Sequence, residues 1–182
     1  MKRNAVLFLA LMAVSTTAFA QSAAETIEHA LAAAPGNARE AATVVKWNPD
    51  FTYETLKKGT NTWVCYDQSG EPGEQPVSAQ CTSLANLPRV AQNRKFETTR
   101  DKAERQKALD AAEADGTRVK PEYGSTWRSV SGPDAAHTRT HTTVAVPGAT
   151  TASTGLPDNP KQGGAWIMNA GTSTAHIMVP GS

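Results

Sequence analysis

Short β-rich segments separated by turn residues recur along most of this chain, and this pattern constrains the fold more than any other feature. Three of them are residues 43–47 (TVVKW), 52–56 and 61–67 (NTWVCYD), with Asn48-Pro49-Asp50 and Gly59 at the breaks. β-Branched and aromatic residues favour strands, whereas Asn, Pro, Asp and Gly favour turns. Three short strands with tight breaks predict an antiparallel meander.

The second half of the chain repeats the pattern. Residues 123–131 and 137–146 are rich in Thr, Ser and Val and flank the turn Gly132-Pro133-Asp134. Residues 165–169 and 174–179 are predicted to be the arms of a C-terminal β-hairpin. We therefore expect an antiparallel β-sheet of six or seven short strands.

Two segments have helical patterns. Residues 23–33 carry apolar residues at helical spacing, Ser22 stands at the capping position, and Pro35-Gly36 ends the segment. Residues 83–115 are rich in charges with i,i+4 spacing, such as Asp101 with Arg105, and have a thin apolar stripe. This composition favours a solvated helix over a partner-binding one. The whole pattern predicts an α+β domain with a short N-terminal helix and a helical insertion.

The first twenty residues resemble an export signal. Lys2 and Arg3 precede an apolar run over residues 5–14, and Ala18-Phe19-Ala20 has the small-x-small pattern of a cleavage site. A membrane-spanning helix needs about 20 apolar residues, so this run is too short to be one. We expect a signal peptide over residues 1–20 and a single exported domain over residues 21–182. We expect this domain in the periplasm or the extracellular medium, with no integral membrane segment.

Charge makes two classes of partner unfavourable. The first twenty residues hold two bases and no acid, so the 18 Lys and Arg of the chain fall to 16 beyond them, against 17 Asp and Glu. Nucleic acid binding normally needs a basic excess on one face, and adsorption to anionic lipid needs a basic cluster. We expect no nucleic-acid partner, and the sequence names no other.

Cys65 and Cys81 are the two cysteines of the chain. In an oxidising compartment two cysteines typically form one structural disulfide. A metal site and a redox dithiol are the alternatives, and both normally need closer spacing or further ligands.

Two stretches carry a resemblance. GTNTWVC at residues 59–65, followed by a second cysteine, and NPKQGGAWIMNAGTSTAHIMVP at residues 159–180 are similar to a group of uncharacterised exported bacterial proteins. Those proteins share a GTNxWxC element and a C-terminal GGxWxM…AHIMVP hairpin. The resemblance implies the fold, export and the Cys65–Cys81 bridge, but no activity. His176 matches the histidine of its AHIM element, and His141 matches a second one.

The histidines are the sharpest candidates for chemistry. His137 and His141 have the i,i+4 spacing that chelates Zn²⁺ on a helix, but on a strand they lie about 13 Å apart. A strand-borne His141 that met His176 and a carboxylate would form a ligand set for Zn²⁺ or Cu²⁺. The alternative is that both histidines simply pack and hydrogen-bond on a polar sheet face.

Other searches for chemistry give nothing. The chain has no GxSxG elbow and no glycine-rich phosphate loop, so we expect no catalytic residue of these kinds and no cofactor. The four tryptophans are predicted to belong to the core, Trp63 and Trp166 above all, rather than to line a ligand cleft. Two classes of function stay open. The first is a non-catalytic exported protein that binds a partner or small ligand, and the second is a histidine- or metal-dependent enzyme of the cell envelope.

Overall fold

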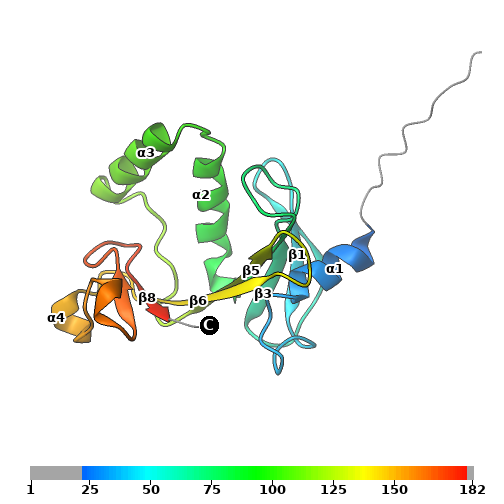
Figure 1. Cartoon of the computed structure of the whole chain (residues 1–182). Helices are drawn as coiled ribbons and strands as arrows, with labels where there is room; N and C mark the ends of the chain where they lie inside the picture. Colours follow the sequence, from blue (N-terminus) through cyan, green and yellow to red (C-terminus); the bar gives the residue numbers. More distant parts are fainter. Residues whose placement is uncertain (1–21, 180–182) are drawn as a thin grey trace, which may run out of the picture.

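The computed structural model describes residues 22–179, in which one eight-stranded sheet lies beside four α-helices (Figure 1). The strands are β1 (Thr43–Trp47), β2 (Tyr53–Lys57), β3 (Trp63–Asp67), β4 (Val77–Ser83), β5 (Thr126–Gly132), β6 (Arg139–Ala145), β7 (Trp166–Met168) and β8 (His176–Val179). The helices are α1 (Ala23–Leu31), α2 (Leu87–Glu97), α3 (Lys102–Ala114) and the single turn α4 (Thr151–Thr154). The α+β class is confirmed, with eight strands instead of six or seven. The predicted signal peptide lies outside the described residues.

The sheet order is β2-β1-β3-β4-β5-β6-β8-β7. All neighbouring strands are antiparallel except β1 and β3, which are parallel. The predicted meander of the first three strands is therefore wrong. β2 forms the sheet edge beside β1, and the chain then returns past β1 to place β3 on its other side.

The GTN element fixes this return. The backbone nitrogens of Thr60 and Asn61 donate to the carbonyl of Ala41 at 2.8 and 3.1 Å. The side-chain nitrogen of Asn61 donates to the carbonyl of Ala38 at 2.9 Å. A Cβ atom at Gly59 would lie 2.3 Å from the Ala41 oxygen, so only glycine allows this close approach. These contacts give the element a structural role.

The segment after the first cysteine departs from the sequence-based prediction. Residues 77–83 form β4, which the sequence did not predict to be a strand, and the predicted helix over 83–115 is divided into α2 and α3. Asp101 lies at the division. Its carboxylate accepts from the backbone nitrogens of Ala103 and Glu104, both at 2.9 Å, so it caps α3 instead of pairing with Arg105.

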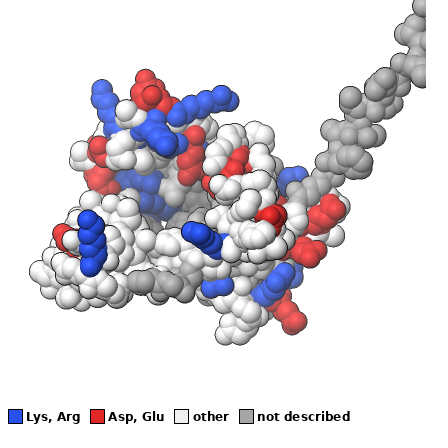
Figure 2. Space-filling view, viewed as in Figure 1, with Lys and Arg blue, Asp and Glu red and all other residues white. Residues whose placement is uncertain are grey.

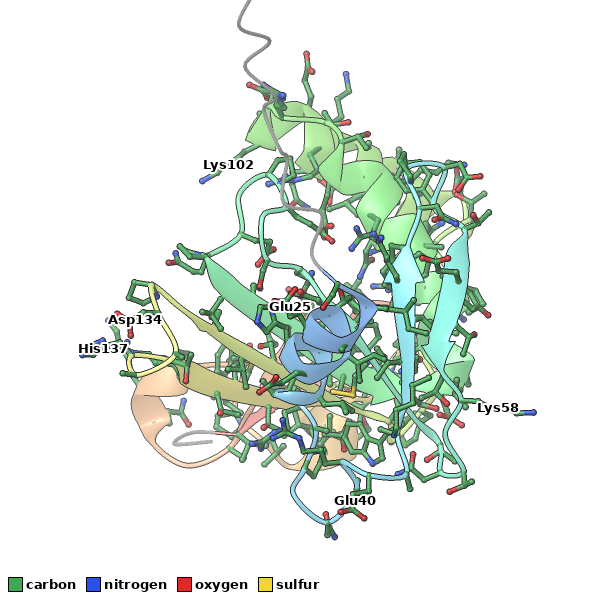
Figure 3. All side chains as sticks on the ribbon, turned by 90° about the vertical axis from the view of Figure 1, so that its right-hand side faces the viewer. Glu25, Glu40, Lys58, Lys102, Asp134 and His137 are labelled. Carbon is green, nitrogen blue, oxygen red and sulfur yellow. A yellow bond between two sulfur atoms is a disulfide. The ribbon has the colours of Figure 1, made fainter. Side chains whose placement is uncertain are left out.

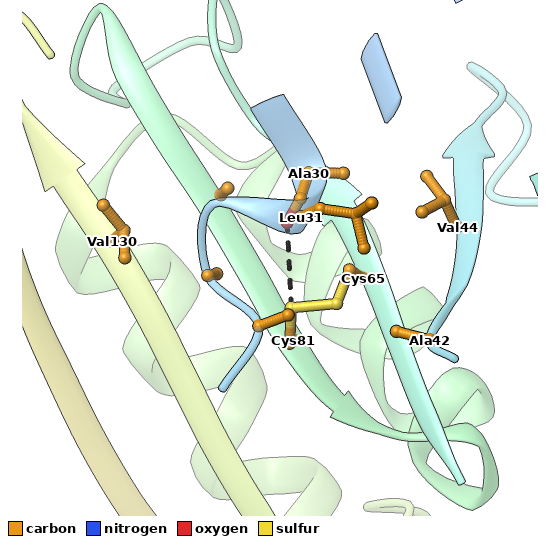
Figure 4. Close-up of a cluster of buried hydrophobic side chains, with 10 residues drawn as sticks. Ala30, Leu31, Ala42, Val44, Cys65, Cys81 and Val130 are labelled. Atoms are coloured by element: carbon orange, nitrogen blue, oxygen red, sulfur yellow. Dashed lines mark hydrogen bonds between the residues drawn. A yellow bond between two sulfur atoms is a disulfide. The ribbon is translucent and has the colours of Figure 1, made fainter. Parts of the chain in front are cut away.

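The first helix and the disulfide belong to the apolar cluster on one face of the sheet. Ser22 caps α1, as the sequence predicted, and Glu25 completes a capping box with it. Cys65 and Cys81 are fully buried, directly opposite each other on β3 and β4, and joined by a disulfide with Cα atoms 4.1 Å apart. Figure 3 shows the disulfide beside α1, and Figure 4 shows Ala30 and Leu31 above it. The Cys81 Sγ atom contacts the carbonyl of Ala30 at 3.7 Å.

The second helix covers the opposite face. Val44 faces the α1 cluster, so its neighbour Val45 faces α2, because successive side chains of a strand alternate. Under α2 the apolar cluster consists of Val45, Val64, Tyr66, Leu87 and Val90, with the partly buried Trp47 and Trp127. A third cluster surrounds Ile167 and Ala175 at the β8–β7 end of the sheet. Trp63 is partly buried against the first cluster, and Trp166 is partly buried on β7.

Candidate functional site

A cavity of about 290 Å³ lies where α2 stands over the sheet. Its sheet side is formed by side chains of β4, β5, β6 and β8, and its other sides by α2, Pro121 and the residues just before β8. The residues that define its chemistry are Gln80, Arg89, Asn93, Trp127, His141 and His176.

Strand register places the sheet residues on one face. Ser129 of β5 is opposite both Gln80 of β4 and His141 of β6. Two residues along, Trp127 is opposite Thr143. Ala145 is in turn opposite His176 of β8. His141, Thr143 and Ala145 therefore share one face of β6, and this face points towards α2.

The two histidines line the same cavity but at different ends of it. His176 is opposite Ala145, which is four residues along β6 from His141. At about 3.3 Å per residue, the two Cα atoms are roughly 13 Å apart along the strand direction. Within residues 22–179, no three His, Cys, Asp or Glu side chains are placed to share a metal ion. The register brings His141 and His176 to one cavity without the third ligand that a metal site requires.

His137 does not belong to this cavity. It lies in the loop between β5 and β6, where its Nδ1 is 2.8 Å from Oδ1 of Asp134. Figure 3 shows this pair at the tip of the loop, pointing away from the body of the molecule. The hydrogen bond to His137 is the largest cause that lowers the pKa of Asp134. The HTRTH motif therefore does not act as a chelating pair.

His176 has one ring nitrogen already engaged. Its Nδ1 lies 2.7 Å from the carbonyl oxygen of Thr174. A carbonyl oxygen can only accept, so Nδ1 carries the hydrogen and donates. In the neutral ring the lone pair is then on Nε2, which is the nitrogen left for a ligand.

Arg89 supplies the charge of the cavity. It is 6% exposed, and one of its terminal nitrogens donates to the carbonyl of Val119. No carboxylate of the described residues lies within 4.0 Å of its guanidinium group. Burial, and after it the charge of Arg118, lowers the pKa of Arg89 to about 10, so the side chain is still charged at neutral pH. The charge of Glu113 acts on Arg89 from a longer distance and partly offsets this lowering. A buried cation without a directly paired carboxylate is a favourable partner for an anion.

The amide of Asn93 is oriented by a second arginine. Arg118 is 8% exposed and donates to Oε1 of Gln92 at 2.6 Å and to Oδ1 of Asn93. With Oδ1 occupied, the NH₂ group of Asn93 has no partner among the residues described. Because Asn93 lines the cavity, it contributes a donor there.

Gln80 is oriented in the same way from the sheet. The hydroxyl of Tyr66 donates to Oε1 of Gln80. Burial raises the pKa of Tyr66 above its ordinary value, so this hydroxyl keeps its hydrogen. The NH₂ group of Gln80 again has no partner in the described part of the chain. Hydrogen bonds within the protein thus orient three side chains whose N–H groups line one cavity, namely those of Gln80, Arg89 and Asn93.

The position of α2 depends on a buried polar residue at its start. Asn86 is fully buried, and its Nδ2 donates to Oγ1 of Thr82 at 2.8 Å and to Oγ of Ser125 at 2.9 Å. Its Oδ1 accepts from the backbone nitrogen of Glu122 at 2.7 Å. These bonds join β4, α2 and the loop that carries Pro121, three of the elements around the cavity.

Sequence reasoning identified the two histidines but missed Arg89, Asn93 and Gln80. Asn86, Arg89 and Asn93 lie at i, i+3 and i+7, which places them on one face of a helix. This polar stripe was the available signal in the sequence. Gln80 lies on β4, which the sequence did not predict to be a strand.

On the face of the molecule seen in Figure 2, the surface carries charged side chains of both signs. Figure 2 shows Lys, Arg, Asp and Glu interspersed over α3 on the face in view. The cationic character of the cavity comes from Arg89, its one arginine or lysine among the described lining residues. None of the described helices is long and apolar enough to cross a membrane.

Comparison of the chain with protein-family models, with curated proteins and with solved structures gave no match.

Proposed function

We propose that this protein binds a small anionic molecule in the cavity between α2 and the sheet. The observation that carries the proposal is Arg89, a buried cation that lines the cavity and has no described carboxylate within 4.0 Å. Charge-assisted hydrogen bonds from arginine to an anion are stronger than neutral ones. The free amide donors of Asn93 and Gln80 support the same class of ligand.

The proposal belongs to the first class that the sequence left open, a binding protein without catalytic chemistry. The second class, a histidine- or metal-dependent enzyme, receives less support. His141 and His176 share the cavity with N–H donors, and among the described residues they have no third side chain with which to bind a metal ion. We also propose that the protein is exported, as the resemblance to exported bacterial proteins implies. The leader pattern and the buried Cys65–Cys81 disulfide support export.

The test is titration of the purified protein with small carboxylates and inorganic phosphate, followed by NMR chemical shifts or calorimetry. Neutral amides of the same carboxylic acids serve as comparison ligands. We expect at least one anion to bind and its amide not to bind. The substitution Arg89→Met should weaken anion binding roughly 10- to 100-fold, since hydrogen bonds to charged groups contribute about 1.5–3 kcal/mol.

The matched control is Arg100→Gln, which removes an exposed arginine between α2 and α3. It should leave anion affinity unchanged. Arg89→Met removes a buried charge but also the hydrogen bond to the Val119 carbonyl, so circular dichroism must show that the ligand-free variant is folded before its anion affinity is compared. Equal affinity for anions and amides, or full anion binding by Arg89→Met, would contradict the proposal.

A further inference from the structure

We infer that the anionic ligand is a small aromatic monocarboxylate whose ring lies against Trp127. This inference rests on the proposed function, since it names the class of anion. It adds an apolar requirement that Arg89 alone does not impose.

The lining of the cavity is divided in character. Gln80, Arg89 and Asn93 present donors, whereas Trp127, Pro121 and Ala175 present carbon surfaces. Trp127 packs partly buried against the apolar cluster under α2 and also lines the cavity. Inorganic phosphate would satisfy the donors and leave these carbon surfaces against water. A ligand with an acidic end and an apolar body satisfies both parts.

The volume of the cavity is sufficient for a single aromatic ring. A cavity of about 150 Å³ accommodates benzene in an apolar protein interior. The cavity here measures about 290 Å³, which leaves space for a carboxylate and one further small substituent.

The number of cationic side chains that line the cavity indicates the charge of the ligand. Arg89 is the one arginine or lysine among the cavity's described lining residues. The neighbouring Arg118 is turned to Gln92 and Asn93 and acts on the ligand through Asn93. One facing guanidinium group matches one carboxylate, which it can bind in bidentate fashion.

The sheet side of the cavity carries an aromatic side chain at its middle. Trp127 and Thr143 stand opposite each other in the middle of this face, with His141 before them and His176 beyond them along the strands. A ring over Trp127 therefore lies between the two histidines. Aromatic contacts prefer offset-stacked or edge-to-face geometry and contribute about 0.5–1.5 kcal/mol beyond burial of area.

The experiment compares four probes on the full mature chain: benzoate, cyclohexanecarboxylate, benzamide and inorganic phosphate. We expect benzoate to bind about fivefold more tightly than cyclohexanecarboxylate, and benzamide not to bind measurably. The ring protons of bound benzoate should shift upfield, because they lie over an indole ring. This NMR signature does not depend on any variant.

Variants test the role of Trp127. Trp127→Leu should remove the preference for benzoate over cyclohexanecarboxylate, and Trp127→Phe, which keeps a ring, should retain most of it. Trp47→Leu is the matched control, because Trp47 packs in the same apolar cluster but does not line the cavity. It should keep the preference.

The outcomes separate the two proposals. Binding of carboxylates or phosphate that depends on Arg89 but shows no preference for an aromatic ring would overturn this inference and leave the proposed function standing. Failure of all three anions to bind would overturn both.

Discussion

At the scale of single residues, the most demanding position is Asn86. Its side chain is fully buried and makes three hydrogen bonds, to Thr82, Ser125 and Glu122. Asn86→Ala removes these bonds and leaves buried donors and acceptors unpaired, at about 1–3 kcal/mol for each unsatisfied group. We expect the free energy of unfolding to fall by about 2–4 kcal/mol in urea denaturation.

The control for Asn86 is Gln106→Ala on α3. Gln106 also makes a side-chain hydrogen bond, to Asp110 at 2.7 Å, but this bond is exposed. Its loss should change the free energy of unfolding by less than about 0.5 kcal/mol. If the two variants lose similar stability, the Asn86 network does not anchor α2.

At the scale of elements, Glu113 of α3 makes a contact with the C-terminal hairpin. The carboxylate of Glu113 accepts from the backbone nitrogen of Ser173 at 2.6 Å and also from its hydroxyl. Ser173 lies in the connection from β7 to β8, immediately before cavity residues Thr174 and Ala175. The Glu113–Ser173 contact therefore joins the helical insertion to the segment that borders the cavity.

This contact should weaken in acid. The hydrogen bonds from the hydroxyl and then the backbone of Ser173 lower the pKa of Glu113 below its ordinary value of 4.5. A carboxyl group with a lowered folded-state pKa contributes stability above the ordinary value, and this contribution is lost as the pH falls through the lowered pKa. We expect the hydrogen-exchange protection of α3 to decline below pH 4.5.

Glu113→Gln should reduce protection of α3 already at neutral pH and remove most of its dependence on pH. The loss of global stability should be small, below about 1 kcal/mol, because the pair is close to solvent. Glu104→Gln, in the first turn of the same helix, is the control and should not change protection near Ser173. Unchanged protection in Glu113→Gln would show that α3 is held by other contacts.

The elements also show what the sequence could predict. β1, β3 and β5 contain branched and aromatic residues, so their composition revealed them. β4 reads VSAQCTS, and its Ser, Ala and Gln residues gave no such signal, although β3 and β5 pair with it on both sides. His141 and His176 were candidates by residue type. Arg89 was not, because its burial depends on where α2 lies over the sheet, and spacing along the chain does not report that.

At the scale of the whole molecule, the apolar residues form three separate clusters instead of one continuous core. The first lies under α1 around the disulfide, the second under α2, and the third at the β7–β8 end. The cavity is lined both by Trp127, which packs on the second cluster, and by Ala175 of the third. The cavity thus lies between these two apolar clusters, over β6, and polar side chains line part of it.

The first cluster is the one that most needs covalent support. Five of its ten described buried members are alanines, and the larger Ile27, Leu56 and Trp63 pack against it only partly buried, so it buries little apolar area per buried residue. The Cys65–Cys81 disulfide crosses this cluster between β3 and β4. Its closed loop is short, and for a loop of about 15 residues the chain-entropy model gives roughly 3 kcal/mol.

We therefore expect the double variant Cys65→Ala/Cys81→Ala to unfold with a free energy about 3 kcal/mol lower than that of the oxidised wild type, measured by chemical denaturation. Wild type denatured under reducing conditions should lose a similar amount.

The disulfide lies on the face covered by α1, whereas the cavity lies on the face covered by α2. Anion affinity should consequently stay within about twofold of wild type at temperatures where the variant is folded, since ΔΔG values of distant sites are approximately additive. A large loss of affinity in the folded variant would mean that the two faces of the sheet are coupled, and unchanged stability would mean that α1 packing alone holds the first cluster together.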